Sequence, residues 1–128
     1  MIVLDSSALV DVLVDQEHAG WVLDHMQSQE LLIPGHQPAE VLSAIARLER
    51  AGVLTAGEAT DALHAASALH HELVPPTMAH IRRAFELRAH IRVLDGLYVA
   101  LAEERRVPLL TTDQRLARAD PPCEVLSP

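Results

Sequence analysis

The sequence predicts an α/β fold, a three-layer sandwich in which helices flank both faces of a mainly parallel central sheet. Five short apolar runs are unbroken by polar residues, which is typical of strands buried on both faces of a parallel sheet. Longer segments between these runs carry apolar residues at helical spacing. A chain of 128 residues can bury its own core, so we expect residues 1–128 to form a single domain.

The expected strands and helices alternate along the chain. The apolar runs predict strands at residues 2–4, 31–33, 73–74, 109–110 and 125–126. The helical periods predict helices around residues 19–26, 41–48, 59–69, 78–85, 97–102 and 114–119. The only three aromatic residues fall within the helical periods, and we expect them in the core: Trp21, Phe85 and Tyr98.

Several helix ends carry capping signals. Pro38 suits the first turn of the helix around residues 41–48, and Gly52 suits the position just past its end. Thr55 and Glu58 have the spacing of a capping box for the helix that follows. The segment 97–102 is apolar on all sides, which predicts a helix packed deep against the sheet.

Charge and cysteine content narrow the class of protein. The net charge is -8, and the acid excess lies in residues 1–80, because residues 81–128 hold eight arginines against seven acids. The chain has no lysine. Its one cysteine, Cys123, permits no internal disulfide. No apolar run approaches the roughly 18 residues of a membrane span and no signal segment is visible, so we expect a cytoplasmic protein without membrane contact.

Four acidic residues stand at junctions along one edge of the predicted sheet. Asp5 follows the first strand, and Glu40 lies in the first turn of the helix after the second. Asp95 precedes the apolar helix, and Asp113 follows the strand at 109–110. Ligands of open α/β sheets bind beyond the carboxyl ends of the strands. Each acid alone also has an ordinary interpretation at a helix N-terminus, Asp113 most clearly as an N-cap.

Together, four carboxylates at one edge repel one another, and no lysine can offset them. We therefore expect a bound cation, Mg²⁺ or Mn²⁺ as its substitute, because these hard ions prefer carboxylate oxygens. Such a site can hydrolyse a phosphodiester. The four acids are predicted to be both metal ligands and catalytic residues, with Glu40 either completing the ligand set or orienting the nucleophile.

The segments around these acids read MIVLDSSALV, AEVLSAIARL, LDGLYVALAE and LLTTDQRLA. Their order and separations resemble a PIN domain, most closely the VapC-type toxin ribonucleases of type II toxin–antitoxin systems. The resemblance implies a Mg²⁺-dependent endoribonuclease with its acids at the same four positions and with Ser6 and Thr112 in support. It also implies an RNA substrate, a cognate VapB-type antitoxin and a homodimer. Some relatives carry a fifth acid where this chain has Gln114 and Arg115, so the number of ions stays open.

Two other functions stay open at this point. A PIN-like domain that has lost catalysis would serve as a binding module, although the presence of all four acids argues against this. A receiver-type signalling domain is also acidic at one edge, but it needs a lysine that this chain lacks. Arginines of the second half could contact phosphate, although helical arginines usually solvate an exposed face. Those considered are Arg82, Arg83, Arg88 and Arg92, and also Arg115.

Overall fold

The computed structural model describes residues 1–128 and contains a five-stranded sheet. Every pair of neighbouring strands is parallel, in the order β3-β2-β1-β4-β5. The strands are β1 (Ile2–Leu4), β2 (Leu31–Pro34), β3 (Glu72–Val74), β4 (Leu109–Leu110) and β5 (Val125–Leu126). All five predicted strands are present, and the predicted parallel α/β class is confirmed.

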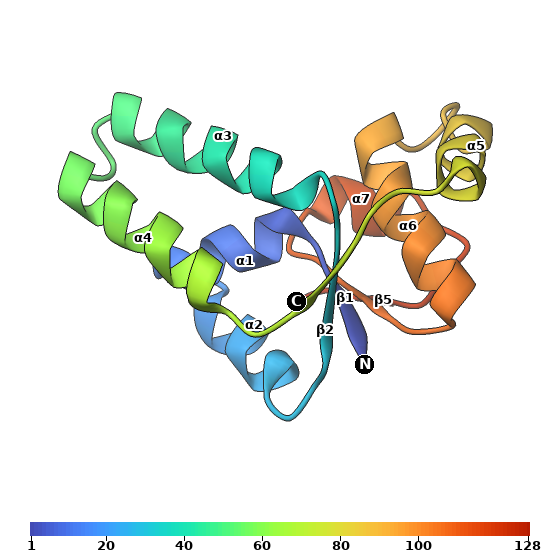
Figure 1. Cartoon of the computed structure of the whole chain (residues 1–128), viewed down its shortest axis with the longest axis horizontal. Coiled ribbons are helices and arrows are strands. Elements are labelled where there is room, and N and C mark those ends of the chain that lie inside the picture. Colours follow the sequence, from blue (N-terminus) through green and yellow to red (C-terminus); the bar gives the residue numbers. More distant parts are fainter.

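Helices cover both faces of this sheet. They are α1 (Ser6–Leu13), α2 (Ala19–Met26), α3 (Gln37–Arg50), α4 (Ala56–Ala68), α5 (Met78–Glu86), α6 (Val93–Arg105) and α7 (Gln114–Arg118). Figure 1 shows α1 to α4 on one side of β1 and β2 and α5 to α7 on the other, which gives the three layers. Helices α3 and α4 pack side by side as a hairpin that extends beyond the sheet. None of the helices has both the length and the apolar character that crossing a membrane requires.

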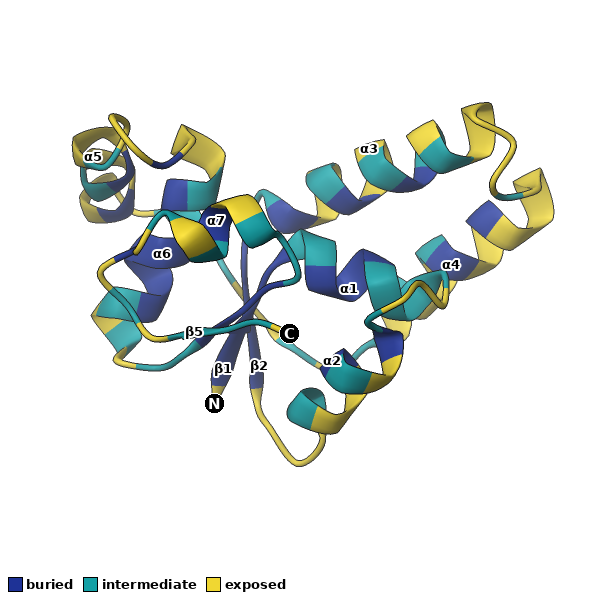
Figure 2. Ribbon diagram, turned by 180° about the vertical axis from the view of Figure 1, so that it is seen from behind, coloured by how far each residue is buried: buried dark blue, intermediate teal, exposed yellow.

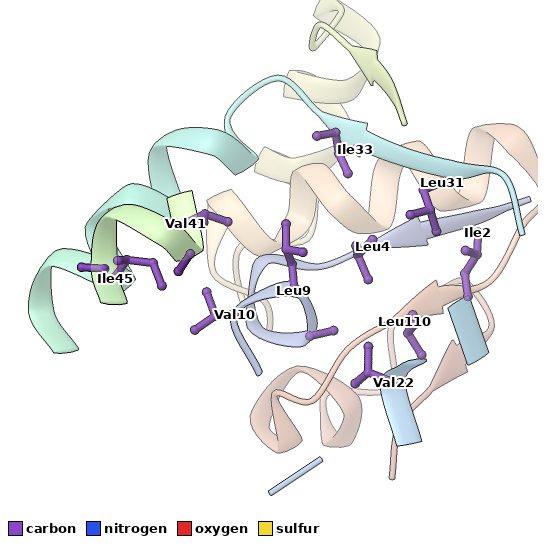
Figure 3. Close-up of a cluster of buried hydrophobic side chains, with 13 residues drawn as sticks. Ile2, Leu4, Leu9, Val10, Val22, Leu31, Ile33, Val41, Ile45 and Leu110 are labelled. Carbon is purple, nitrogen blue, oxygen red and sulfur yellow. The ribbon is translucent and has the colours of Figure 1, made fainter. Parts of the chain in front are cut away.

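The core divides into two clusters because side chains alternate along each strand. Ile2 and Leu4 of β1 pack with residues of α1 to α4, and Figure 3 shows this cluster. Val3 of β1 points the other way and packs with Tyr98 and Val99 of α6. Figure 2 shows β1 and β2 buried, with exposed residues on the outer sides of the helices. Burial on both faces explains why these strands are apolar throughout.

The capping signals are confirmed in detail. Thr55 Oγ1 accepts from the Glu58 N–H, and Glu58 Oε1 accepts from the Thr55 N–H, which completes the capping box of α4. Pro38 lies in the first turn of α3, and Gly52 follows the end of this helix with a φ of 76°. The apolar segment of α6 is buried from Tyr98 to Ala102, as expected.

Three expectations about the fold were wrong. Residues 6–13 form helix α1, which was not predicted because its apolar residues follow β1 without a Gly or Pro boundary. Strands β3 and β5 are not buried on both faces: both are edge strands, Leu73 of β3 is 47% exposed, and Val125 and Leu126 of β5 are half-buried. Phe85 is not in the core, since it is 58% exposed on α5, where Arg88 lies over its ring. Tyr98 is fully buried and Trp21 is half-buried.

Candidate active-site cleft

The four predicted acids line one cleft of about 840 Å³ at the carboxyl edge of the sheet. Asp5 lies between β1 and α1, Glu40 and Asp95 lie in the first turns of α3 and α6, and Asp113 is the N-cap of α7. Gln37 fixes the start of α3 here, because its buried amide donates to the Leu4 carbonyl at the end of β1. The topology therefore brings together four carboxylates from segments far apart in the sequence.

Asp5 is the most buried of these acids, at 3% exposure. Its Oδ2 accepts hydrogen bonds from the hydroxyls of Ser7 and Thr111, each at 2.6 Å. The pKa of Asp5 is raised from 3.8 to about 6: burial raises it most, the two hydroxyl hydrogen bonds lower it, and the charges of Asp95 and Glu40 raise it. The carboxyl group is thus held rigidly in a poorly solvated position.

Glu40 is held from the opposite side of the cleft. Its Oε1 accepts a hydrogen bond of 2.7 Å from the Tyr98 hydroxyl and one of 3.4 Å from Ser6 Oγ. His36 Nε2 lies 3.4 Å from the same oxygen and 3.0 Å from the Leu94 carbonyl oxygen. Burial raises the pKa of Tyr98, and the negative charges of Asp5 and Glu40 raise it further, so the phenol keeps its proton and donates.

Asp95 and Asp113 share one cationic partner, Arg92. Arg92 Nε donates to Asp95 Oδ2 at 3.0 Å, and its Nη2 donates to Asp113 Oδ2 at 3.4 Å. Burial raises the pKa of Asp95, while the Arg92 guanidinium lowers it and the charges of Asp113 and Glu40 raise it again. Hydrogen bonding to Asp95 raises the pKa of Arg92, and the negative charge of Asp113 raises it further.

This pairing corrects one step of the sequence argument. The absence of lysine suggested that no side chain of the chain offsets the acids, but Arg92 offsets two of them. Arg92 is not part of an arginine stripe on α5, because it is the N-cap residue of α6. It lies three residues before Asp95, so the two side chains are neighbours at the start of the helix.

Asp113 has two functions at once. Its Oδ1 accepts from the backbone N–H groups of Arg115 and Leu116, at 2.9 and 3.4 Å, and so caps α7. Its Oδ2 is directed to Arg92. The helix-cap interpretation is therefore confirmed, and it leaves one carboxylate oxygen of Asp113 on the cleft.

The donors of the cleft fit a hard divalent cation in their chemistry. Carboxylate and hydroxyl oxygens predominate, and these are the ligands of Mg²⁺ and Mn²⁺. Burial, and to a smaller extent the charges of Asp95 and Glu40, raise the pKa of Asp5, and a bound cation would favour its ionised form. As the side chains stand, however, no three of the acidic, histidine or cysteine side chains converge as a ligand set. Each acid is turned toward a partner within the chain, and the partner of Asp95 and Asp113 is a cation.

Only some of the other predicted site residues lie at the cleft. Ser6 lines the cleft, with its Oγ 3.5 Å from Asp5 Oδ1 and 3.4 Å from Glu40 Oε1. Thr112 contributes its backbone N–H to Ser7 Oγ, whereas Thr111 makes the contact with Asp5. Of the five arginines considered for phosphate contact, only Arg92 lines the cleft, and Arg82, Arg83, Arg88 and Arg115 lie outside it. Arg82 and Arg115 are exposed, and Arg83 pairs with Glu103 and Glu86.

The residues that hold the acids in place differ in how far the sequence could reveal them. Ser7 lies two residues after Asp5, a spacing at which hydroxyl and carboxylate side chains often bond locally, so a local signal existed. Arg92 carried the same kind of signal relative to Asp95. Thr111 and Tyr98 had none, because they are 106 and 58 residues from the acids that they contact.

Comparison with known proteins identifies the family of the chain. The family model described as "PIN domain" matches residues 2–121. The chain is 37% identical over 126 residues to the ribonuclease VapC3 of Mycobacterium tuberculosis. The aligned residues cover 94% of this chain and 88% of that protein.

Solved structures share the fold at lower sequence identity. The crystal structure of Mycobacterium tuberculosis VapC20, described as a toxin that cleaves the sarcin-ricin loop, superposes with a TM-score of 0.72 at 14% identity over 94% of this chain and 96% of that chain. A toxin–antitoxin complex from Klebsiella pneumoniae also gives 0.72, at 16% identity over 98% of this chain and 96% of that chain.

Proposed function

The chain belongs to the PIN domain family, and from this premise we propose that it is a VapC-type endoribonuclease, the toxin of a toxin–antitoxin pair. The observation that carries the proposal is the meeting of Asp5, Glu40, Asp95 and Asp113 in one cleft, in a chain similar to named ribonucleases. The reaction is hydrolysis of RNA phosphodiester bonds. A receiver-type signalling domain is rejected, because the family model that matches nearly the whole chain is that of a PIN domain.

We assign the acids to a divalent-cation site. Asp5, Asp95 and Asp113 hold the ion, Mg²⁺ or Mn²⁺ as its substitute, either directly or through water, and Glu40 completes the ligand set or orients the nucleophile. When bound, such an ion supplies positive charge that stabilises the developing charge on the phosphodiester and lowers the pKa of water. The choice of a hard cation rests on the oxygen donors of the cleft.

The neighbours of the acids preorganise the site. Ser7 and Thr111 fix the Oδ2 of Asp5, and its Oδ1 lies 3.5 Å from Ser6 Oγ at the cleft. Tyr98 holds Glu40 by Oε1, which leaves Glu40 Oε2 without a partner in the chain. Groups already fixed in place need no reorganisation as the charge of the transition state develops. The free oxygen of Glu40 is suited to accept a proton or a hydrogen bond from an attacking water.

The proposed partner is a VapB-type antitoxin, because the chain is similar to a VapC ribonuclease and shares its fold with a toxin–antitoxin complex from Klebsiella pneumoniae. The cleft holds more carboxylates than the one arginine that pairs with them can offset, so an arginine or lysine of such a partner would bind well there. We also propose a homodimer, in keeping with the family resemblance.

The test is RNA cleavage by the purified protein. We expect cleavage with Mg²⁺ or Mn²⁺, none in EDTA, and a loss of more than about tenfold in Asp5→Asn and in Asp95→Asn, because an ion contributes several kcal/mol to transition-state stabilisation. Asp61→Asn is the matched control, since Asp61 is exposed on α4 and makes no hydrogen bond or ion pair. Full activity of both cleft variants would place the site elsewhere. A folded, metal-binding parent protein that cleaves no RNA would support the inactive binding module instead.

A further inference from the structure

Arg92 differs from every other arginine of the chain in where its side chain lies. It is at the mouth of the acidic cleft, 61% exposed, with Nε on Asp95 and Nη2 on Asp113. Its Nη1 has no partner in the chain, so part of the guanidinium remains free to bind another anion. Arg47 of α3 is the only other arginine that lines the cleft, and it is not paired with any acid.

The guanidinium occupies one oxygen of Asp95 and one oxygen of Asp113, both potential ligands of a divalent cation. Asp113 Oδ1 is engaged with the N-terminus of α7, so Oδ2 is the only oxygen of this residue available to the cleft. That oxygen and Asp95 Oδ2 are the two atoms to which Arg92 donates. Two cations at these atoms would repel each other strongly. A divalent ion that binds Asp113 through this oxygen therefore competes with the guanidinium for it.

A displaced Arg92 stays close to the reaction. Its backbone is the N-cap of α6, three residues before Asp95, so the tether holds the guanidinium near the mouth of the cleft. RNA must pass this mouth to reach the acids, and arginine binds phosphate oxygens through two parallel N–H groups. The side chain is already exposed, so little packing is lost when it moves.

Resting on the proposed ribonuclease function, we propose that Arg92 is an exchangeable cation: it neutralises Asp95 and Asp113 before the metal binds and afterwards contacts a backbone phosphate of the RNA. The same charge thus serves the free protein and the substrate complex in turn. Arg92 then competes with the metal and assists RNA binding. A substitution of Arg92 should therefore strengthen metal binding and weaken RNA binding, and the two effects can be measured separately.

The first arm of the test measures Mn²⁺ affinity by titration calorimetry without RNA. Arg92→Gln should bind Mn²⁺ about threefold to tenfold more tightly than the parent, the range expected when exposed ion pairs no longer compete. Arg47→Gln removes the same charge from the cleft without breaking a pair, and its Mn²⁺ affinity should change by less than about twofold. Circular dichroism checks that both variants fold. An unchanged or weaker Mn²⁺ affinity for Arg92→Gln, or an equal gain in both variants, would overturn the exchange.

The second arm measures RNA cleavage at saturating Mn²⁺. Arg92→Gln should raise KM for a single-stranded RNA about fivefold or more, with a smaller change in kcat, since one phosphate contact of the bound RNA is lost. Tighter Mn²⁺ binding with an unchanged KM would refute the phosphate contact, and Arg92 would then only compete with the metal for the carboxylates. If the parent does not cleave RNA, the proposed function fails. The Mn²⁺ titration still decides the competition, and RNA binding followed by fluorescence anisotropy in Mn²⁺ replaces KM.

Discussion

Replacing Asp5 by asparagine should stabilise the metal-free protein at neutral pH although it removes a residue of the proposed site. Asp5 is 3% exposed, and burial together with the charges of Asp95 and Glu40 raises its pKa from 3.8 to about 6. A carboxyl that binds its proton more tightly in the folded state destabilises that state once it is ionised. The isosteric amide carries no charge and avoids this cost.

The magnitude follows from the displaced pKa. Below pH 3.8 both folded and unfolded chains are protonated at Asp5, and the stabilisation from the bound proton is fully present. As the pH rises to about 6 the unfolded chain loses this proton first, so the free energy of unfolding falls. Above the folded pKa the loss is complete, and the difference between 3.8 and about 6 corresponds to about 3 kcal/mol.

The asparagine should recover most of this energy. Its carbonyl oxygen can replace Asp5 Oδ2 as the acceptor for Ser7 and Thr111, and its amide group then faces Ser6 Oγ, which can accept. Hydrogen bonds to a neutral acceptor are weaker than those to a carboxylate, which offsets part of the gain. We expect Asp5→Asn to be more stable than the parent by about 1 to 3 kcal/mol at pH 8, and by less than about 0.5 kcal/mol at pH 4.

Urea denaturation in EDTA, followed by circular dichroism from pH 4 to pH 8, measures this difference. Asp61→Asn is the control, since its side chain is exposed and unpaired, and its difference from the parent should not vary with pH in the same way. A destabilised Asp5→Asn at pH 8, or a gain that does not shrink toward pH 4, would refute the argument that burial of a charge sets the energy of this position.

Three further outcomes are expected from the same geometry. Tyr98→Phe should lower the free energy of unfolding by about 1 kcal/mol and also slow RNA cleavage, because Glu40 Oε1 loses its shortest hydrogen bond; unchanged melting and activity would show that this bond does not position Glu40. Mg²⁺ should raise the melting temperature of the parent by binding only the folded state, and Asp95→Asn should lose most of that rise; an intact rise would exclude Asp95 as a ligand. A VapB-type antitoxin, co-purified from its operon, should bind Asp113→Asn more weakly than the parent; equal affinity would place its contacts elsewhere.

Local patterns in the sequence predicted most of the fold and the position of the acids. Strands β1, β2 and β4 are buried on both faces, so they contain no polar residue and stand out as apolar runs. The acids were found because the carboxyl ends of parallel strands share one edge. The exposure of Leu73 was not predictable in this way, because only the strand order makes β3 an edge strand.

The partners of the acids required tertiary information. Thr111 reaches Asp5 because β4 lies beside β1, and Tyr98 reaches Glu40 because α6 packs against β2, the strand that leads into α3. Contacts between residues so far apart in the sequence cannot be predicted from local spacing. Arg92 was different, since it lies only three residues before Asp95. It was overlooked as a partner of the acids because the sequence argument considered only lysine as the neutralising side chain.

Asp113 shows why a helix cap and a site residue need not be competing interpretations. A carboxylate has two oxygens, and here Oδ1 satisfies the backbone N–H groups at the start of α7 while Oδ2 faces the cleft. The cap fixes the side-chain torsion of Asp113, and this fixes the position of the second oxygen. The helix end that made Asp113 look ordinary in the sequence is therefore what holds its second oxygen beside Arg92. A residue that only capped α7 would not need to present this charge to a cleft already lined by three other carboxylates of the proposed site.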